Sequence, residues 1–205
     1  MKLVGAKLAA SVLVLAMAPI AMAESKYEAG SYQIDAMHSK VGFEIPHLVI
    51  SSVEGKFNQS EGEIKLDSNF SKSSVKVSTD VSSIDTGVAK RDDHLKSADF
   101  FDVKKYPTMK FESTDISGTP DAFKLTGNLT LHGVTKKVVL DAKYLGTVKD
   151  GYGNEKAAFD AKTKISRKDY GLTWNNVVEA GPVVGDEVSI SLKIQAAKAA
   201  PKAKK

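Results

Sequence analysis

Strict two-residue alternation of apolar side chains runs along most of this chain and limits what it can fold into. Between Leu125 and Tyr144 the apolar residues keep one parity before a turn at 132–135 and one parity after it. Such alternation gives each strand one apolar face and one polar face. The pattern recurs from Tyr32 to Ile194 at the roughly 8–12-residue spacing typical of an all-β barrel or sandwich. We therefore expect a single curved sheet around an apolar interior.

Residues 1–23 have the pattern of a secretory signal peptide and are set apart from the fold. Lys2 and Lys7 precede an apolar run shorter than the ~20 residues that cross a bilayer, and small residues at 21–23 offer a cleavage site. A retained membrane anchor is the alternative. The chain has no cysteine, which excludes disulfides and thiol catalysis. We expect an exported protein, periplasmic if the cell is Gram-negative.

Charge does not favour a nucleic-acid partner. Six of the 29 Lys and Arg residues lie at the two ends of the chain, which leaves 23 against 25 acidic residues in 24–197. No basic stripe interleaved with aromatic residues is present. We expect one domain, residues 24–197, and a disordered Ala/Lys/Pro tail, residues 198–205, whose lysines would allow transient contact with an anionic membrane.

One segment departs from the alternation and predicts a short helical insertion around residues 88–104. Asp92 and Asp93 could each begin the helix, Leu95 follows on a helical spacing, and Pro107 lies beyond its end. In a barrel such an insertion either lies across an open end, with its aromatic residues over the interior, or is a plain connection that caps the core.

Short sequence pieces in a fixed order resemble one known family over nearly the whole mature domain. They lie between Tyr32 and Ile194, and together they resemble the YceI-like family of exported proteins. The pieces are Asp35-Ala36-Met37-His38-Ser39, Gly55-Lys56-Phe57, Arg91-Asp92-Asp93-His94-Leu95, Asp99-Phe100-Phe101-Asp102, Tyr106-Pro107, Phe111-Glu112-Ser113 and Leu125-Thr126-Gly127-Asn128-Leu129-Thr130-Leu131-His132-Gly133-Val134-Thr135.

The resemblance implies a lipocalin-like antiparallel barrel of eight strands whose elongated apolar cavity holds a polyisoprenoid chain, such as a quinone tail, or another long amphiphilic lipid. It implies no catalysis and no covalently bound cofactor. A true lipocalin usually has a Gly-x-Trp signature near the start of the barrel, whereas Trp174, the single tryptophan, lies late in the chain. The identity of the lipid and the choice between carriage and storage stay open, because prenyl chains, fatty acids and fatty amides present similar tails.

Physical reasoning supports such a ligand, because eight strands enclose an interior just wide enough for side chains or one slender molecule. A prenyl chain offers nothing to hydrogen-bond, so its affinity comes from apolar burial, roughly 0.8 kcal/mol per CH₂, less the cost of ordering the chain. For each candidate, ordinary core packing is the alternative to ligand binding. The candidate ligand-binding residues are Phe43, Ile45, Phe57, Leu95, Phe100, Phe101, Met109, Phe111, Leu129, Leu131 and Trp174.

The histidines give no metal-binding pattern. His38, His47, His94 and His132 show none of the spacings of zinc sites, so we expect no metal. His94 belongs to a polar group with two neighbours, Arg91 and Asp92, that either binds a lipid head group or fixes the start of the helix through hydrogen bonds and charge pairing; the second interpretation is favoured.

A lipid-directed enzyme, either a hydrolase or an isomerase, is the alternative function. The chain has no nucleophile motif and no phosphate-binding glycine loop. Scattered residues such as Asp35, His38 and Arg167 could nevertheless carry chemistry in a barrel. A binding protein whose interior is filled by side chains, and a homodimer, are also compatible with the sequence.

Overall fold

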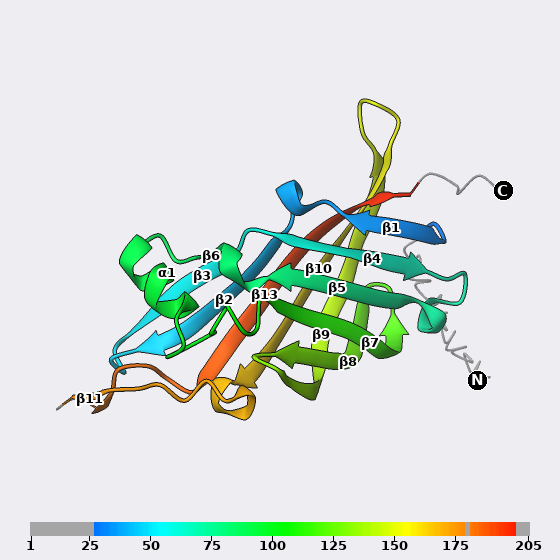
Figure 1. Cartoon of the computed structure of the whole chain (residues 1–205). Coiled ribbons are helices and arrows are strands. Elements are labelled where there is room, and N and C mark those ends of the chain that lie inside the picture. The colour runs from blue at the N-terminus through cyan, green and yellow to red at the C-terminus, as the bar shows by residue number, and fades with distance from the viewer. Residues whose placement is uncertain (1–26, 179–180, 200–205) are drawn as a thin grey trace, which may run out of the picture.

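The computed structural model describes residues 27–178 and 181–199, which form a closed antiparallel β-barrel (Figure 1). Eight strands close it in the order β1-β4-β5-β7-β8-β9-β10-β13, because β13 also pairs with β1, placing Tyr32 opposite Lys198. The all-β, eight-stranded antiparallel barrel expected from the sequence is confirmed.

The strands follow one another along the chain with short helical turns between some of them. The barrel strands are β1 (Gly30–Ile34), β4 (Ser60–Leu66), β5 (Ser74–Asp80), β7 (Thr108–Thr119), β8 (Ala122–Leu131), β9 (Val134–Lys149), β10 (Glu155–Ser166) and β13 (Glu187–Lys198). The others are β2 (Lys40–His47), β3 (Ser51–Phe57), β6 (Ile84–Asp85), β11 (Val177–Val178) and β12 (Gly181–Pro182). The helices are α1 (Ala89–Lys96) and the 3-10 turns η1 (Ala36–His38), η2 (Phe70–Lys72), η3 (Val81–Ser83) and η4 (Arg167–Tyr170).

The two ends of the barrel differ because β13 has two partners along one edge. Its C-terminal end pairs with β1, whereas its N-terminal half pairs with β2, where Ser189 lies opposite Glu44. We call the β1–β13 end the closed end. At the other end β2, β3 and β6 diverge from the ring and α1 lies beside them (Figure 1). We call this the helix end.

The alternating apolar residues point into the barrel as predicted. Tyr32, Ile64, Leu125, Leu140 and Phe159 are all buried and belong to one apolar cluster, although they come from five different strands. Burial of one parity on every strand leaves the other parity to solvent, which fixes the register of the sheet.

The β8–β9 hairpin turn is tighter than the sequence indicated. Leu131 pairs directly with Val134, so the turn comprises His132 and Gly133 rather than residues 132–135. Both have positive φ, 50° and 75°, which is the backbone of a two-residue hairpin with glycine second. A Cβ at Gly133 would also lie 2.5 Å from Cε1 of Tyr106. Both the positive φ and this close contact therefore favour glycine over a residue with a side chain.

The helical insertion is present around residues 88–104 as predicted, but neither candidate first residue, Asp92 or Asp93, begins the helix. α1 begins at Ala89, before Asp92 and Asp93. The Asp92 carboxylate does not cap the helix, because it accepts hydrogen bonds from the N–H and Oγ1 of Thr86, at 2.9 and 2.6 Å. Arg91 donates to the Thr86 carbonyl at 2.8 Å. Arg91 and Asp92 thus fix the loop before the helix, as the favoured interpretation predicted, whereas the third member of the polar group, His94, bonds to Asp99 after the helix.

The ends of the chain lie partly outside the described residues. The predicted signal peptide, residues 1–23, falls there, as do residues 200–205 of the predicted tail. Lys198, assigned to that tail, instead belongs to β13, and the Ala199 N–H donates to the Ser31 carbonyl at 2.7 Å. Within 27–178 and 181–199, no helix is both long and apolar enough to cross a membrane.

Candidate functional site

Two adjoining cavities occupy the interior of the barrel. The strand-walled cavity, about 140 Å³, is lined by side chains of all eight barrel strands and by Val41 of β2. The helix-end cavity, about 260 Å³, lies between β2, β3, α1 and the segments that follow α1 and η4. Val41, Met109 and Ile190 line both, so these three side chains stand at the junction of the two cavities.

The strand-walled cavity is almost wholly apolar. Its few polar lining residues are Ser73, Thr79, Asp160 and Thr163. An apolar cavity of about 150 Å³ in a protein interior stays dry and takes up small hydrocarbons. This half of the interior therefore suits a hydrocarbon chain and offers little to a polar group.

The helix-end cavity adds aromatic and cationic side chains from irregular segments. Phe100 and Trp174 lie 4.9 Å apart between ring centroids, and the His94 ring contacts both at about 5 Å. His94 Nε2 lies 2.9 Å from a carboxylate oxygen of Asp99, which orients the ring. These three rings come from α1 and two loops, and they add to the aromatic side chains that β2 and β3 contribute to the cavity wall.

All eleven candidate ligand-binding residues line one or both cavities. Phe111 and Leu129 line the strand-walled cavity, Met109 lines both, and the other eight line the helix-end cavity. The eight are Phe43, Ile45, Phe57, Leu95, Phe100, Phe101, Leu131 and Trp174. Lipid binding by these residues stays a prediction.

Most residues that line the strand-walled cavity are not among the eleven candidate ligand-binding residues. Its wall includes side chains from β4, β5, β9 and β13 that the parity pattern had already placed inward: Ile64, Leu66, Val75, Val77, Val138, Leu140, Leu192 and Ile194. Parity separates inward from outward residues but does not show which inward residues border a void. The candidate residues therefore cover mainly the helix-end cavity and only a small part of the strand-walled cavity.

Phe111 reaches the cavity because the neighbouring strand has a glycine. A Cβ at Gly127 would lie 2.5 Å from Cζ of Phe111 and 2.6 Å from the Glu112 carbonyl oxygen. The Phe111 ring occupies the space where a side chain on β8 would stand. Gly127 in the resemblance piece from Leu125 to Thr135 is thus a packing requirement of the cavity wall.

Arg167 holds the loop that carries Trp174. Its guanidinium donates to the carbonyls of Gly185, Leu172 and Trp174 at 2.8, 2.6 and 2.8 Å and lies 3.4 Å from an Asp186 carboxylate oxygen. Burial lowers the pKa of Arg167, and the nearby Asp186 charge opposes this. With its donors engaged by backbone, Arg167 positions the wall of the helix-end cavity.

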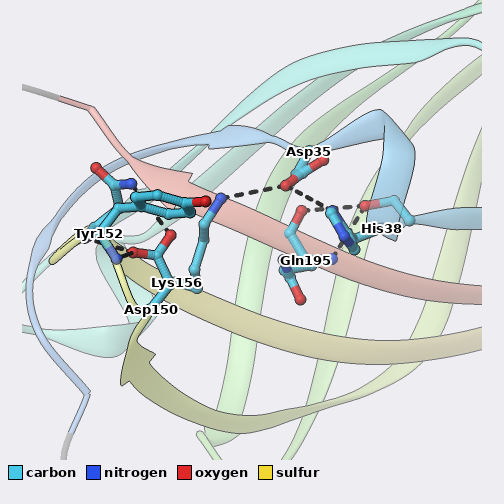
Figure 2. Close-up of polar contacts among 8 residues, drawn as sticks. Asp35, His38, Asp150, Tyr152, Lys156 and Gln195 are labelled. Atoms are coloured by element: carbon cyan, nitrogen blue, oxygen red, sulfur yellow. Dashed lines mark hydrogen bonds and ion pairs between the residues drawn. The ribbon is translucent and has the colours of Figure 1, made fainter.

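The polar residues of the enzyme hypothesis do not form one site. Figure 2 shows His38 and Lys156 both directed at Asp35; His38 Nδ1 and Lys156 Nζ lie 3.0 and 3.2 Å from its Oδ2. Burial works against ionisation of Asp35, but these hydrogen bonds outweigh it and hold its pKa below the usual range. Arg167 follows the far end of β10, eleven residues beyond Lys156, or roughly 35 Å at the rise of a strand.

A buried polar network seals the closed end. The Tyr32 hydroxyl donates to the Glu155 carboxylate, which Lys198 Nζ approaches at 3.0 Å. Burial opposes the charge on Glu155, yet hydrogen bonds, the largest from Tyr32, hold its pKa below the usual range. Burial, and then the Glu155 hydrogen bond, raise the pKa of Tyr32. The network joins β1, β10 and β13 where the barrel closes.

The histidines are dispersed over the structure. They lie in η1, at the end of β2, on α1 and in the β8–β9 turn. No group of three or more His, Cys, Asp or Glu side chains suited to a metal ion occurs in the described parts of the chain.

Comparisons with known proteins agree with this architecture. The model of the YceI-like domain matches residues 32–196. A UPF0312 protein of Pseudomonas paraeruginosa is 37% identical over 187 residues, covering 87% of this chain and 95% of the relative. BcnA of Burkholderia cenocepacia superposes with a TM-score of 0.69 at 25% identity, covering 80% of this chain and 99% of that one. A polyisoprenoid-binding domain from Saccharophagus degradans superposes with a TM-score of 0.62 at 16% identity, covering 84% and 100%; it is similar in fold.

Proposed function

Because this chain belongs to the YceI-like domain family, we propose that its barrel binds one polyisoprenoid chain, such as the tail of an isoprenoid quinone, for carriage or storage. The observation that carries this proposal is a pair of adjoining, mainly apolar cavities that share Val41, Met109 and Ile190 in their walls. Ligand pockets commonly measure about 300–1,000 Å³, and only the two cavities together reach that range. A solved relative in fold is described as a polyisoprenoid-binding domain, which supports the same ligand class.

The tail would lie in the strand-walled cavity and the head group at the helix end. Along β8 the lining runs from Phe123 to Leu131, roughly 25 Å at the rise of a strand. Polar ring and guanidinium groups border the interior at the helix end, from His47, Arg91 and His94. A tail-first arrangement therefore leaves few polar groups without hydrogen-bonding partners.

Binding without catalysis is part of the proposal. Asp35 and His38 lie beside Lys156 at the closed end, and Arg167 serves the loop at the other end. An acid, a base and an oxyanion donor would have to converge within hydrogen-bonding distance of one reacting atom. These residues do not, which favours a carrier that returns its ligand unchanged. The proposed site of action is the periplasm, on the pattern of residues 1–23.

Mass spectrometry of the protein purified without detergent tests the ligand directly. We expect an organic extract of the wild type to contain an unmodified prenyl lipid, at about one molecule per protein. The variant Phe111→Lys places a charge in the strand-walled cavity and should lose most of it. Val139→Lys is the matched control, because Val139 is an exposed apolar residue outside the cavities.

Three results would contradict the proposal. These are an extract with no lipid, equal retention by the two variants, or the release of a chemically altered lipid after incubation with an added one. The last result would favour the enzyme instead.

A further inference from the structure

The tip of the β2–β3 hairpin exposes apolar side chains at the helix end. Three residues, Leu48, Val49 and Ile50, connect the strands after the His47–Ser51 pair. The Val49 and Ile50 residues are 67% and 89% exposed. Val178, at 43% exposed, belongs to the adjacent β11. The tip lies beside β11 at the lower left of Figure 1, away from the closed end of the barrel.

The backbone of this tip is strained. Leu48 and Val49 have φ of 51° and 65°, in the left-handed region that glycine, asparagine and aspartate tolerate. For a β-branched valine this conformation is a true outlier, and three-residue hairpin loops normally place glycine there. Strain of this kind persists where the surrounding structure imposes it, and it is concentrated at functional segments. The fold keeps two exposed apolar side chains where polar turn residues would be more stable.

The tip is continuous with the helix-end cavity. Pro46 and His47, immediately before it, line that cavity, and so do Val183 and Val184. The Leu48 N–H donates to the Val183 carbonyl at 3.0 Å, and the Ser51 hydroxyl donates to the His47 carbonyl at 3.0 Å. These backbone groups are thus satisfied within the protein, which lowers the cost of placing the tip in a less polar medium.

We propose that Val49 and Ile50 insert into the surface of a phospholipid bilayer, so that the lipid passes between the membrane and the helix-end cavity along this hairpin. The inference rests on the proposed function, since it concerns how the ligand reaches the cavity. A bilayer is favoured over a protein partner because a stable protein interface takes about 800 Å² and 20–30 residues on each side. A tip of three residues offers far less, but it suits shallow insertion at a membrane interface.

Flotation with vesicles of phosphatidylethanolamine and phosphatidylglycerol tests membrane contact. We expect the wild type to float with the vesicles. Val49→Asp or Ile50→Asp should bind at least about tenfold more weakly, because each variant replaces an aliphatic group that would insert into the bilayer with a charge. Val148→Asp is the matched control. Val148 is also a 67% exposed valine, but it belongs to β9 near the closed end. Aspartate tolerates positive φ better than valine, so Val49→Asp should fold.

The effect of salt on vesicle binding distinguishes insertion of the hairpin tip from electrostatic attraction to the membrane. Insertion of apolar side chains should survive high salt, whereas attraction of the lysine-rich segment 198–205 to anionic lipid should be screened. No flotation of the wild type, release by salt, or equal weakening by Val148→Asp and the tip variants would each overturn the proposal.

Loading from cyclodextrin distinguishes failure of the tip from failure of lipid binding. A prenyl alcohol delivered from cyclodextrin bypasses the membrane, and the fluorescence of Trp174, the single tryptophan, reports its arrival in the helix-end cavity. Wild type and tip variants should load equally from cyclodextrin, and only the tip variants should load slowly from vesicles. If the wild type does not load from cyclodextrin, the proposed function fails, while flotation still decides membrane contact.

Discussion

The closed end and the helix end of this barrel surround one apolar interior, but they are built from different structural elements. At the closed end the wall consists of hydrogen-bonded strands, and Tyr32, Glu155 and Lys198 join its seam. At the helix end strands such as β2 and β3 form only part of the wall, and α1 and two loops with half-buried aromatic side chains complete it beside a strained tip. Segments with fewer backbone hydrogen bonds to a sheet open at lower free energy. For the proposed lipid ligand, this difference makes the helix end the expected route of entry, while the closed end stays fixed.

Replacement of Arg167 is expected to have the largest effect on stability, because one side chain holds the loop of the helix end. Arg167→Met leaves the carbonyls of Leu172 and Trp174 without their donor, and we expect a loss of at least about 3 kcal/mol in the free energy of unfolding. Urea unfolding measures it.

Lys168→Met is the control, because Lys168 is exposed and its ion pair is with the half-exposed Asp186, an interaction worth about 1 kcal/mol or less. Equal losses in the two variants would show that the loop does not depend on Arg167.

Leucine truncation compares the packing of the two ends directly. Leu140 is 4% exposed in the closed-end core, and Leu140→Ala should cost about 2–5 kcal/mol of unfolding free energy. Leu95 on α1 is only partly buried, so we expect Leu95→Ala to cost less than half as much. Denaturant unfolding of both variants provides the comparison. Equal costs would mean that α1 packs as firmly as a barrel strand.

Much of the fold followed from the sequence because strand parity is a local property. Ile64, Leu125 and Leu140 reveal their inward orientation through neighbours two residues away, without any knowledge of partner strands. The pairing of β1 with β13 is different, since it joins residues more than 160 positions apart. Alternation shows that a strand exists but not which strand is beside it, so the closed, eight-stranded form rested on the family resemblance.

The candidate site was predictable only in part, for a related reason. Phe101 and Trp174 stood out because large aromatic residues are conspicuous, and they do line a cavity. The voids of the strand-walled cavity depend on how side chains from five or more strands pack together. The sequence of any one strand does not contain this information. The start of α1 was misplaced because Asp92 bonds to Thr86 rather than to the helix terminus, and a short acidic pair cannot distinguish these arrangements.

The pH dependence of stability tests the polar seam of the closed end. Because the pKa of Glu155 is lowered in the folded state, its contribution is complete above the unfolded value of 4.5 and is lost as the pH falls below it. Glu155→Gln should therefore lower the free energy of unfolding by about 1–2 kcal/mol at neutral pH, and the difference from wild type should shrink in acid. Unfolding curves from neutral pH to pH about 3 measure this.

Glu187→Gln is the control for the seam, because Glu187 is exposed and pairs with the exposed Lys164. We expect that variant to change stability by less than about 1 kcal/mol. A Glu155→Gln difference that does not vary with pH would mean that the carboxylate charge does not hold the seam.

The smallest expected effect is a gain in stability at the strained tip. Val49→Asn relieves a β-branched residue at φ 65°, so we expect about 0.5–1 kcal/mol of added unfolding free energy. Val148→Asn, at an equally exposed valine within β9, should give no gain because asparagine is disfavoured in strands. The sign of the difference in urea midpoints decides between these expectations. Val49→Asn can thus be more stable than the wild type and yet bind vesicles more weakly. That combination would mean that the strained valine is retained for membrane contact at the expense of stability.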